Sequence, residues 1–394
     1  MSNIFSVILG SGFSAPYGYP TAYKINKIIS CLKEDDIEIF TSGSCRFKIR
    51  KTLNTKWIPI NDTASFIALF LEFYNKEILI SKDFNYEDFF DYYQDLLYNS
   101  ITDERFLLFL NTRFNERYDR INQLMKFDDC FNQLISQLLH KKMVFKKFNN
   151  LTGQIESTRF VGFLYFLKYL IENNYQLKIH TLNHDLLLDY IFKYLTEFNK
   201  YDDGFSDKGS PFFCYNASHK KVFLQYFNNN FNSNICIYKL HGNLNFYFHH
   251  SEKNTDIIKV THGLNWGSIS KILMSENGKI SISEYKGNFH PEFLSGRNFK
   301  ISRSQGEHYY KPVFEHFKNN LSHSENLLVV GYSFRDKYIN EIIKENYINK
   351  SNKRIVLIDN RNIANDNPFG ESIDLLKKNI SKVSKDELIK TFNL

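Results

Sequence analysis

Four short segments of the sequence carry residue types that suit a nucleotide site. Each places Gly, Ser, Asn, Asp or His directly after an apolar run that is typical of a buried strand. A doubly wound sheet binds its ligand outside the carboxyl ends of its strands, so four polar strand ends predict one shared crevice. The segments are Gly10-Ser11-Gly12-Phe13-Ser14-Ala15, Thr181-Leu182-Asn183-His184-Asp185, Lys239-Leu240-His241-Gly242 and Gly331-Tyr332-Ser333-Phe334-Arg335-Asp336.

The first segment has the glycine spacing of a dinucleotide-binding turn. Gly10 and Gly12 would let backbone amides approach a pyrophosphate, and the following helix N-terminus favours its negative charge. Ala15 stands where the usual pattern has a third glycine. No acidic residue is evident at the end of a second strand about 20 residues further on, which disfavours a hydride-transferring dehydrogenase.

Each segment alone also has an ordinary structural explanation. Asn183 and Asp185 could cap a helix, since their side-chain oxygens accept free backbone amides. His241-Gly242 could be a turn, and the segment at 331–336 a strand-to-helix loop. Their joint occurrence, each at the end of an expected strand, favours a single site.

The elements that must position these segments alternate between strand and helix. Strands are expected at 4–9, 177–182, 235–240, 326–331 and 354–359, and helices at about 20–32, 185–198, 308–320 and 336–348. Apolar residues recur at helical spacing between 63 and 174, whereas 35–62 is irregular. A loop is expected at 201–233, and loop with short strands at 250–305. This pattern predicts an α/β fold with a Rossmann-like parallel sheet and an inserted helical subdomain. We expect one domain over residues 1–394, with the core at 1–34 and 175–365, the mainly helical insertion at 35–174 and a helical tail at 366–394.

The composition excludes some classes of protein. The 394 residues carry a net charge of +7, which permits phosphate-bearing ligands but falls short of a nucleic-acid footprint and leaves direct nucleic-acid binding open. The five cysteines include no CxxC pair, which argues against a zinc ribbon and a disulfide scaffold. With no signal peptide and no apolar stretch of membrane-spanning length, a cytoplasmic protein without membrane association is expected.

Taken together, the four segments resemble the sirtuin family. The first, followed by Gly18-Tyr19-Pro20, is similar to the family's GAGxSxxSGIP opening, and the third to its His-Gly motif. Thr181-x-Asn183-x-Asp185 resembles the family's TQNID and is nearer to the TxNYD of bacterial sirtuin-like defence proteins. The fourth segment has the GYSxxD form of the same defence branch.

The resemblance implies that NAD is the substrate and gives each matching residue a role. Asn183 and His241 would be catalytic, Asn183 by contacting the ribose and positioning water, His241 as a base or orienting group on the ribose hydroxyls. The binding residues would be Gly10, Gly12, Ser14 and Ala15 for the pyrophosphate, Asp185 for the nicotinamide carboxamide, Gly331 and Ser333 for a phosphate near the adenosine half, and Asp359 or Asn360 for the adenosine ribose.

These side chains also suit the chemistry on general grounds. A cationic nicotinamide departs as a neutral ring, so its N-glycosidic bond needs little leaving-group activation. The reaction does need a held ribose, hydrogen bonds that strengthen as an oxocarbenium ion forms, and a placed nucleophile. An amide, a carboxylate and an imidazole are suitable groups for these tasks.

The departures from the family narrow the expected activity. Zinc-binding sirtuins carry two CxxC pairs beyond the His-Gly motif, whereas this chain has no cysteine after His241. We therefore expect no zinc or other metal, and an NAD glycohydrolase that releases nicotinamide and ADP-ribose. The defence-type motifs imply an antiphage effector that depletes cellular NAD.

The resemblance also implies partners. A homo-oligomer is expected, activated in trans by a HerA-type ATPase or helicase in preference to an Argonaute-type partner. Two alternatives stay open: a non-catalytic scaffold subunit of an ATPase complex that binds NAD or ADP-ribose, and an NAD-dependent protein deacylase.

Overall fold

The first strand of the chain is buried on both of its faces. β1 (Ile4–Leu9) has the nearly continuous apolar sequence of a parallel strand covered by helices on either side. Phe5 and Val7 belong to one hydrophobic core and Ile8 belongs to another, as the alternation of side chains along a strand requires. β1 therefore lies in the middle layer of a three-layer arrangement.

Six parallel strands form the central sheet of the computed structural model. The structure describes residues 3–40, 45–48, 61–80, 82–98, 103–114, 120–140, 153–198, 200–206, 212–215, 221–250, 255–260, 273–276, 279–282, 309–349, 353–361, 369 and 373–394. The strands are β1, β4 (Gln176–Thr181), β8 (Ile235–Lys239), β13 (Asn326–Val330), β14 (Arg354–Ile358) and β15 (Ile373–Leu376). Their order is β15-β14-β13-β1-β4-β8, so the chain runs outward from β1 first on one side and then on the other. This doubly wound order, with its switch point between β1 and β13, confirms the predicted Rossmann-like fold.

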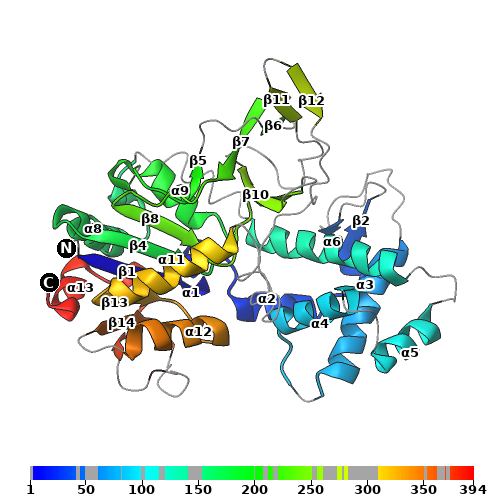
Figure 1. Ribbon diagram of the computed structural model, residues 1–394. Coiled ribbons are helices and arrows are strands. Elements are labelled where there is room, and N and C mark those ends of the chain that lie inside the picture. Colours follow the sequence, from blue (N-terminus) through cyan, green and yellow to red (C-terminus); the bar gives the residue numbers. More distant parts are fainter. Residues whose placement is uncertain are drawn as a thin grey trace.

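Helices cover both faces of this sheet (Figure 1). The core on one face includes residues of α8 (Val161–Glu172), α9 (Leu187–Tyr194) and α13 (Lys385–Phe392). The core on the other face includes residues of α11 (Tyr310–His323) and α12 (Lys337–Ile343), which a π-helical segment (Lys344–Ile348) extends. The predicted helices at 185–198, 308–320 and 336–348 are thus present within a few residues of their expected ends.

A third hydrophobic core lies in the helical unit between β1 and β4. After the short α1 (Ser11–Ser14), the unit contains α2 (Ala22–Ser30), α3 (Asn61–Phe73), α4 (Tyr86–Tyr98), α5 (Glu104–Arg113) and α6 (Arg120–Leu139), with a π-helical segment (Tyr74–Ile78) after α3. Phe66, Phe70, Phe89 and Phe127 are fully buried in its centre, so the stripes seen in the sequence are core faces. Ile25 and Ile29 of α2 belong to the same core, which ties the unit to the turn after β1.

Two regions that we expected to be irregular contain strands. A small hairpin, β2 (Ile37–Ile39) and β3 (Cys45–Phe47), lies within 35–62. β5 (Phe205–Ser206), β6 (Phe212–Tyr215) and β7 (Lys221–Phe227) lie within the predicted loop at 201–233. They join β9 (Phe246–His250), β10 (Thr255–Val260), β11 (Leu273–Glu276) and β12 (Lys279–Ile282) in a seven-stranded antiparallel sheet. Backbone hydrogen bonds to distant partners hold such strands, so a composition rich in Gly, Asn and Ser does not reveal them.

The tail is also not entirely helical, contrary to the expectation for 366–394. β15 pairs in parallel with β14 and forms an edge of the central sheet, before α13 ends the chain. Asp374 and Leu375 of β15 are exposed, as an edge strand allows, and this weak apolar pattern hid the strand from sequence reasoning. Likewise α8, which falls in the range 35–174, packs on the central sheet.

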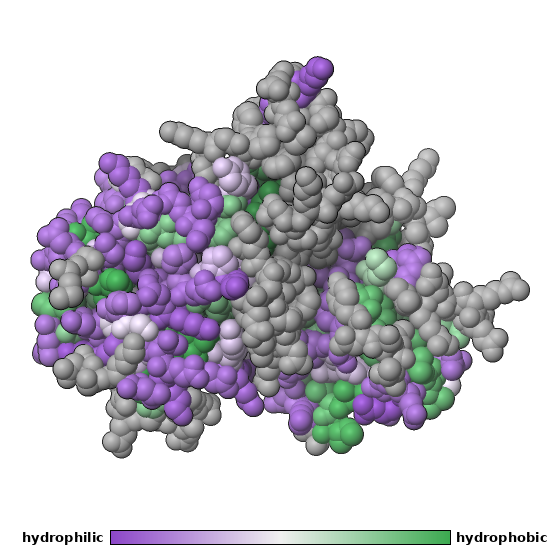
Figure 2. Space-filling model, in the orientation of Figure 1, coloured by the Kyte–Doolittle hydropathy of each residue, from purple (hydrophilic) through white to green (hydrophobic). Residues whose placement is uncertain are grey.

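The surface differs between the two parts of the molecule. On the face drawn in Figure 2, hydrophilic residues dominate over the sheet-bearing part, and hydrophobic residues gather over the helical unit. Ile80, Leu108 and Met125 of that unit are each more than half exposed. Among the described residues, no helix combines the length and the apolar character needed to span a membrane.

The loops that follow β1 and β13 meet in direct backbone contact at the switch point. The Gly12 amide donates to the Gly331 carbonyl oxygen at 3.0 Å, and the Gly10 amide donates to the Val330 carbonyl oxygen at 2.9 Å. A Cβ atom on Gly331 would lie 2.5 Å from the Gly12 Cα, and Gly331 has a φ of +59°. Only glycine allows two backbone segments to approach each other so closely.

Gly331→Ala is therefore expected to destabilise the fold strongly. Gly18→Ala is a matched control, because Gly18 also has a positive φ (+84°) but would place its Cβ in open space. We expect the Gly331 variant to lose at least about 2 kcal/mol more unfolding free energy than the Gly18 variant, through the added clash. Urea denaturation followed by circular dichroism measures both, and equal losses would contradict the close contact.

Candidate functional site

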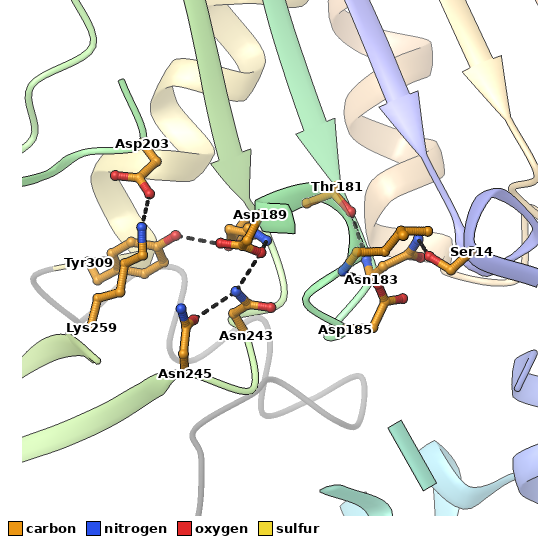
Figure 3. Close-up of polar contacts among 12 residues, drawn as sticks. Ser14, Thr181, Asn183, Asp185, Asp189, Asp203, Asn243, Asn245, Lys259 and Tyr309 are labelled. Carbon is orange, nitrogen blue, oxygen red and sulfur yellow. Dashed lines mark hydrogen bonds and ion pairs between the residues drawn. The ribbon is translucent and has the colours of Figure 1, made fainter. Parts of the chain in front are cut away.

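Asn183 is held at the end of β4 by the glycine loop. Its Nδ2 donates to the Gly10 carbonyl oxygen at 2.9 Å and contacts the Ser14 Oγ at 3.1 Å (Figure 3). The side chain is buried, and its own backbone amide donates to the Thr181 hydroxyl at 3.1 Å. The plane of the Asn183 amide is therefore fixed relative to the turn that follows β1.

Ser14 holds Asp185 as well as Asn183. The Ser14 hydroxyl hydrogen bonds with the Asp185 carboxyl, which also accepts the Leu187 amide at 2.9 Å. Burial raises the pKa of Asp185 above its ordinary value, although these bonds and the charge of Lys239 act to lower it. Ser14 itself is 1% exposed, so its hydroxyl positions the two strand-end residues inside the protein.

His241 lies in the turn after β8 and faces the loop after β13. Its Nε2 is 3.2 Å from the Asp336 Oδ2, and both side chains are buried. Asp336 also caps α12 by accepting the Ile339 amide at 3.2 Å. A carboxylate beside an imidazole orients the ring and stabilises its protonated form, which suits a group that accepts a proton during a reaction.

A buried polar network supports the loop that carries His241. Lys239, directly before that loop, pairs with Asp189 of α9, and the Asn243 Nδ2 contacts the same carboxylate at 3.2 Å (Figure 3). The Tyr309 hydroxyl donates to the Lys239 carbonyl oxygen at 3.1 Å. Burial acts to raise the pKa of Asp189, but the charges of Lys239 and Lys259 outweigh it and hold this pKa below its ordinary value.

Two cavities meet at the carboxyl edge of the central sheet. The inner cavity, of about 110 Å³, has Asn183, Asp185 and His241 in its wall. The outer cavity, of about 380 Å³, lies over the ends of β13 and β14. Both are lined by Ser11, Ala22, Ser333 and Arg335, so the two form one elongated groove across the switch point. The outer cavity has the size of a small-molecule site, whereas the inner one suits a single ring.

The structure brings most of the predicted site residues into this groove. The inner cavity is lined by Gly10, Asn183, Asp185, His241 and Ser333, and the outer by Gly12, Ala15, Gly331, Ser333, Asp359 and Asn360. Ser14, which we expected at the pyrophosphate, is the exception, because it is turned inward to Asn183 and Asp185. The described part of the chain contains no group of three or more His, Cys, Asp or Glu residues that could hold a metal ion.

Sequence reasoning missed the residues that the helical unit adds to the inner cavity. Asn26 of α2, Asn85, Tyr86 and Glu87 at the start of α4, and Leu139 of α6 line the side opposite the strand ends. The Asn26 Oδ1 accepts the Tyr86 amide at 2.9 Å, which docks α4 on α2. Asn85 before a helix is a recognisable turn residue, but nothing in its spacing connects it to the strand-end motifs.

The comparisons with known proteins agree with this arrangement at the level of the family. Residues 178–379, just over half of the chain, match the model of the SIR2-like domain. The chain therefore belongs to the SIR2-like family. A search of curated proteins finds no match.

Solved sirtuin structures are similar to the chain only distantly. Sir2Tm bound to a propionylated peptide has 12% sequence identity and a TM-score of 0.38, over 100% of this chain and 94% of that one. A Sir2 homologue in complex with NAD has 11% identity and a TM-score of 0.40, over 100% and 90% of the two chains. Similarity at this level does not identify the ligand of the groove.

The two buried carboxyls of the site predict opposite effects of pH on stability. The pKa of Asp185 is raised, so the stability of the fold falls as the pH rises through that pKa and the carboxyl ionises. The pKa of Asp189 is lowered, so its carboxylate stabilises the fold above the ordinary aspartate pKa of about 3.9. Asp185→Asn is expected to preserve or raise Tm at pH 7. Asp189→Asn is expected to cost about 3 to 5 kcal/mol, because it leaves Lys239 buried without its carboxylate.

Thermal unfolding between pH 3 and pH 8 measures both effects. The difference between each variant and the wild type should shrink as the pH falls below about 4, where aspartate is protonated in the unfolded chain. A loss of Tm at pH 7 in Asp185→Asn as large as that in Asp189→Asn would contradict these opposite roles.

Proposed function

We propose that this chain is an NAD glycohydrolase that releases nicotinamide and ADP-ribose. The observation that carries the proposal is the groove itself, whose inner end gathers Asn183, Asp185 and His241 and whose outer end lies over β13 and β14. A dinucleotide lying across the switch point would place nicotinamide in the inner cavity, the pyrophosphate at the glycine loops and adenosine in the outer cavity.

The reaction follows from the groups around the inner cavity. The bond between the ribose C1′ and the nicotinamide nitrogen breaks, and the ring leaves with the electron pair as a neutral molecule. A water oxygen forms the new bond to C1′ and gives its proton to the imidazole of His241, which the Asp336 carboxylate stabilises. Asn183 holds the ribose and the water in this reaction. Its amide is suited to this role because its hydrogen bond to the Gly10 carbonyl oxygen fixes its orientation.

The helical unit supports water as the acceptor. It supplies one wall of the inner cavity through Asn26, Tyr86, Glu87 and Leu139, and the volume there is about 110 Å³. A space of this size suits nicotinamide and water better than an acylated lysine with its peptide. The sequence also lacks the cysteine pairs of zinc-binding sirtuins. Protein deacylation is therefore the alternative and not the main proposal.

We further propose that the hydrolase acts as an antiphage effector that depletes NAD. The TxNHD and GYSxxD forms of the motifs support this role through their resemblance to the defence branch. Activity of this kind must be restrained in a healthy cell, so we propose a homo-oligomer that a HerA-type ATPase activates in trans. The exposed Leu108 and Met125 of the helical unit offer apolar surface for such contacts.

Loss of either catalytic side chain is expected to abolish most nicotinamide release. Asn183→Ala and His241→Ala should each lower kcat by at least about 100-fold, the usual contribution of a positioned acid–base or orienting group. Asn173→Ala and His323→Ala are matched controls, since these exposed side chains only bond carbonyl oxygens of their own helices. The assay follows nicotinamide by chromatography, for the chain alone and co-expressed with a HerA-type ATPase as the proposed partner.

The alternatives predict different outcomes of the same assay. If the wild type releases no nicotinamide in either state, the hydrolase proposal fails and the non-catalytic scaffold is favoured. Release that requires an acylated peptide identifies a deacylase. Release that survives both substitutions refutes the assignment of Asn183 and His241.

A further inference from the structure

The outer cavity contains an acidic residue whose charge is already paired. The side chain of Asp359, at the end of β14, is 3% exposed. Its Oδ1 accepts a hydrogen bond from the Arg361 Nε at 2.9 Å, and its Oδ2 accepts one from a terminal guanidinium nitrogen of Arg361 at 2.6 Å. The Arg361 backbone amide also donates to the first oxygen at 2.9 Å. One arginine therefore neutralises the carboxylate and hydrogen bonds with both of its oxygens.

This pairing changes what the end of the groove can bind. A carboxylate at the end of a Rossmann strand commonly accepts the ribose hydroxyls of NAD and repels a phosphate there, whereas a neighbouring arginine accommodates that phosphate. The guanidinium keeps a full positive charge and presents its N–H donors in a planar fork that matches a phosphate. Arg361 is half exposed in the wall of the cavity, where a ligand can reach it.

The surrounding charges favour an anion at the same place. Arg335 and Lys378 line the outer cavity together with Arg361, and Asp359 is the one acidic residue among its described lining residues. Lys378 is itself paired with Glu387 at 2.5 Å, so it contributes less than its charge alone implies. Arg335 lines both cavities and lies where the pyrophosphate would cross. Arg361 is therefore the cation best placed at the adenosine end.

We propose that Arg361 and the outer cavity bind a phosphate on the adenosine ribose, so that the enzyme accepts NADP as well as NAD. This inference rests on the proposed function for the direction of the dinucleotide in the groove. Arg361 has two roles in this proposal. It neutralises the Asp359 carboxylate, which would otherwise repel a phosphate, and it presents donors in a geometry that suits phosphate. A phosphorylated ribose then meets a site of net positive charge.

Binding of two products, ADP-ribose and its 2′-phosphorylated form, tests the proposal independently of catalysis. Isothermal titration calorimetry compares ADP-ribose with 2′-phospho-ADP-ribose, and the wild type should bind the phosphorylated ligand at least as tightly. Arg361→Ala should weaken the phosphorylated ligand by about 10-fold to 100-fold, as expected for lost charge-assisted hydrogen bonds, and change ADP-ribose by less than about threefold. Arg354→Ala is a matched control, because Arg354 forms an exposed pair with Asp374 at the opposite end of β14.

Cleavage assays with NAD and NADP complete the test. The ratio of kcat/KM for NADP to that for NAD should fall about 10-fold or more in Arg361→Ala and stay constant in Arg354→Ala. Equal losses for both ligands, or wild-type protein that binds ADP-ribose at least tenfold more tightly, would overturn the assignment of Arg361. If neither dinucleotide is cleaved but the binding preference holds, the proposed hydrolysis fails and the phosphate site stands.

Discussion

The contact between the glycine loops at the switch point is the constraint on which the rest of the site depends. Gly12 and Gly331 bring the loops after β1 and β13 together at backbone distance, so neither loop can move without the other. Through α2, the first loop leads into the helical unit. Through Asp336, the second reaches His241 on the far side of the groove. Two strands and an inserted unit are thus aligned by a contact that only glycine permits.

Buried polar bonds, rather than apolar packing, hold Asn183 and the His241 loop in place. Asn183 is fixed by a backbone carbonyl and a serine hydroxyl, and the His241 loop by the pair of Lys239 with Asp189. Such bonds are directional and act in a low dielectric, so they define the positions of groups more sharply than hydrophobic contacts do. The cost is the burial of charge, which is tolerated in Lys239 and Asp189 because each is the partner of the other.

The insertion between β1 and β4 gives the family fold a separate wall for its groove. It has its own Phe-rich core, and α2 belongs both to this core and to the chain that leaves the glycine turn. Asn85, Tyr86 and Glu87 therefore line the inner cavity together with the strand-end residues, although they come from a unit with a core of its own. An insertion of this kind can change one wall of a groove while the residues at the sheet edge stay the same.

Much of the fold and site could be predicted because the signals are local. Continuous apolar runs mark the strands of a parallel sheet, and polar residues directly after them must lie at its carboxyl edge, so Gly10, Asn183, His241 and Ser333 converge for topological reasons. β5 to β7 and β15 were not predicted, since backbone pairing with distant or edge partners leaves little trace in side-chain order. The inward orientation of Ser14, the approach of Asp336 to His241, and the bonds between Arg361 and Asp359 were equally hidden. The sequence by itself determined which residues stand at the strand ends. Tertiary structure alone decided which of them face the groove and which are bonded to each other, because burial and distance between remote segments exist only once the chain has folded.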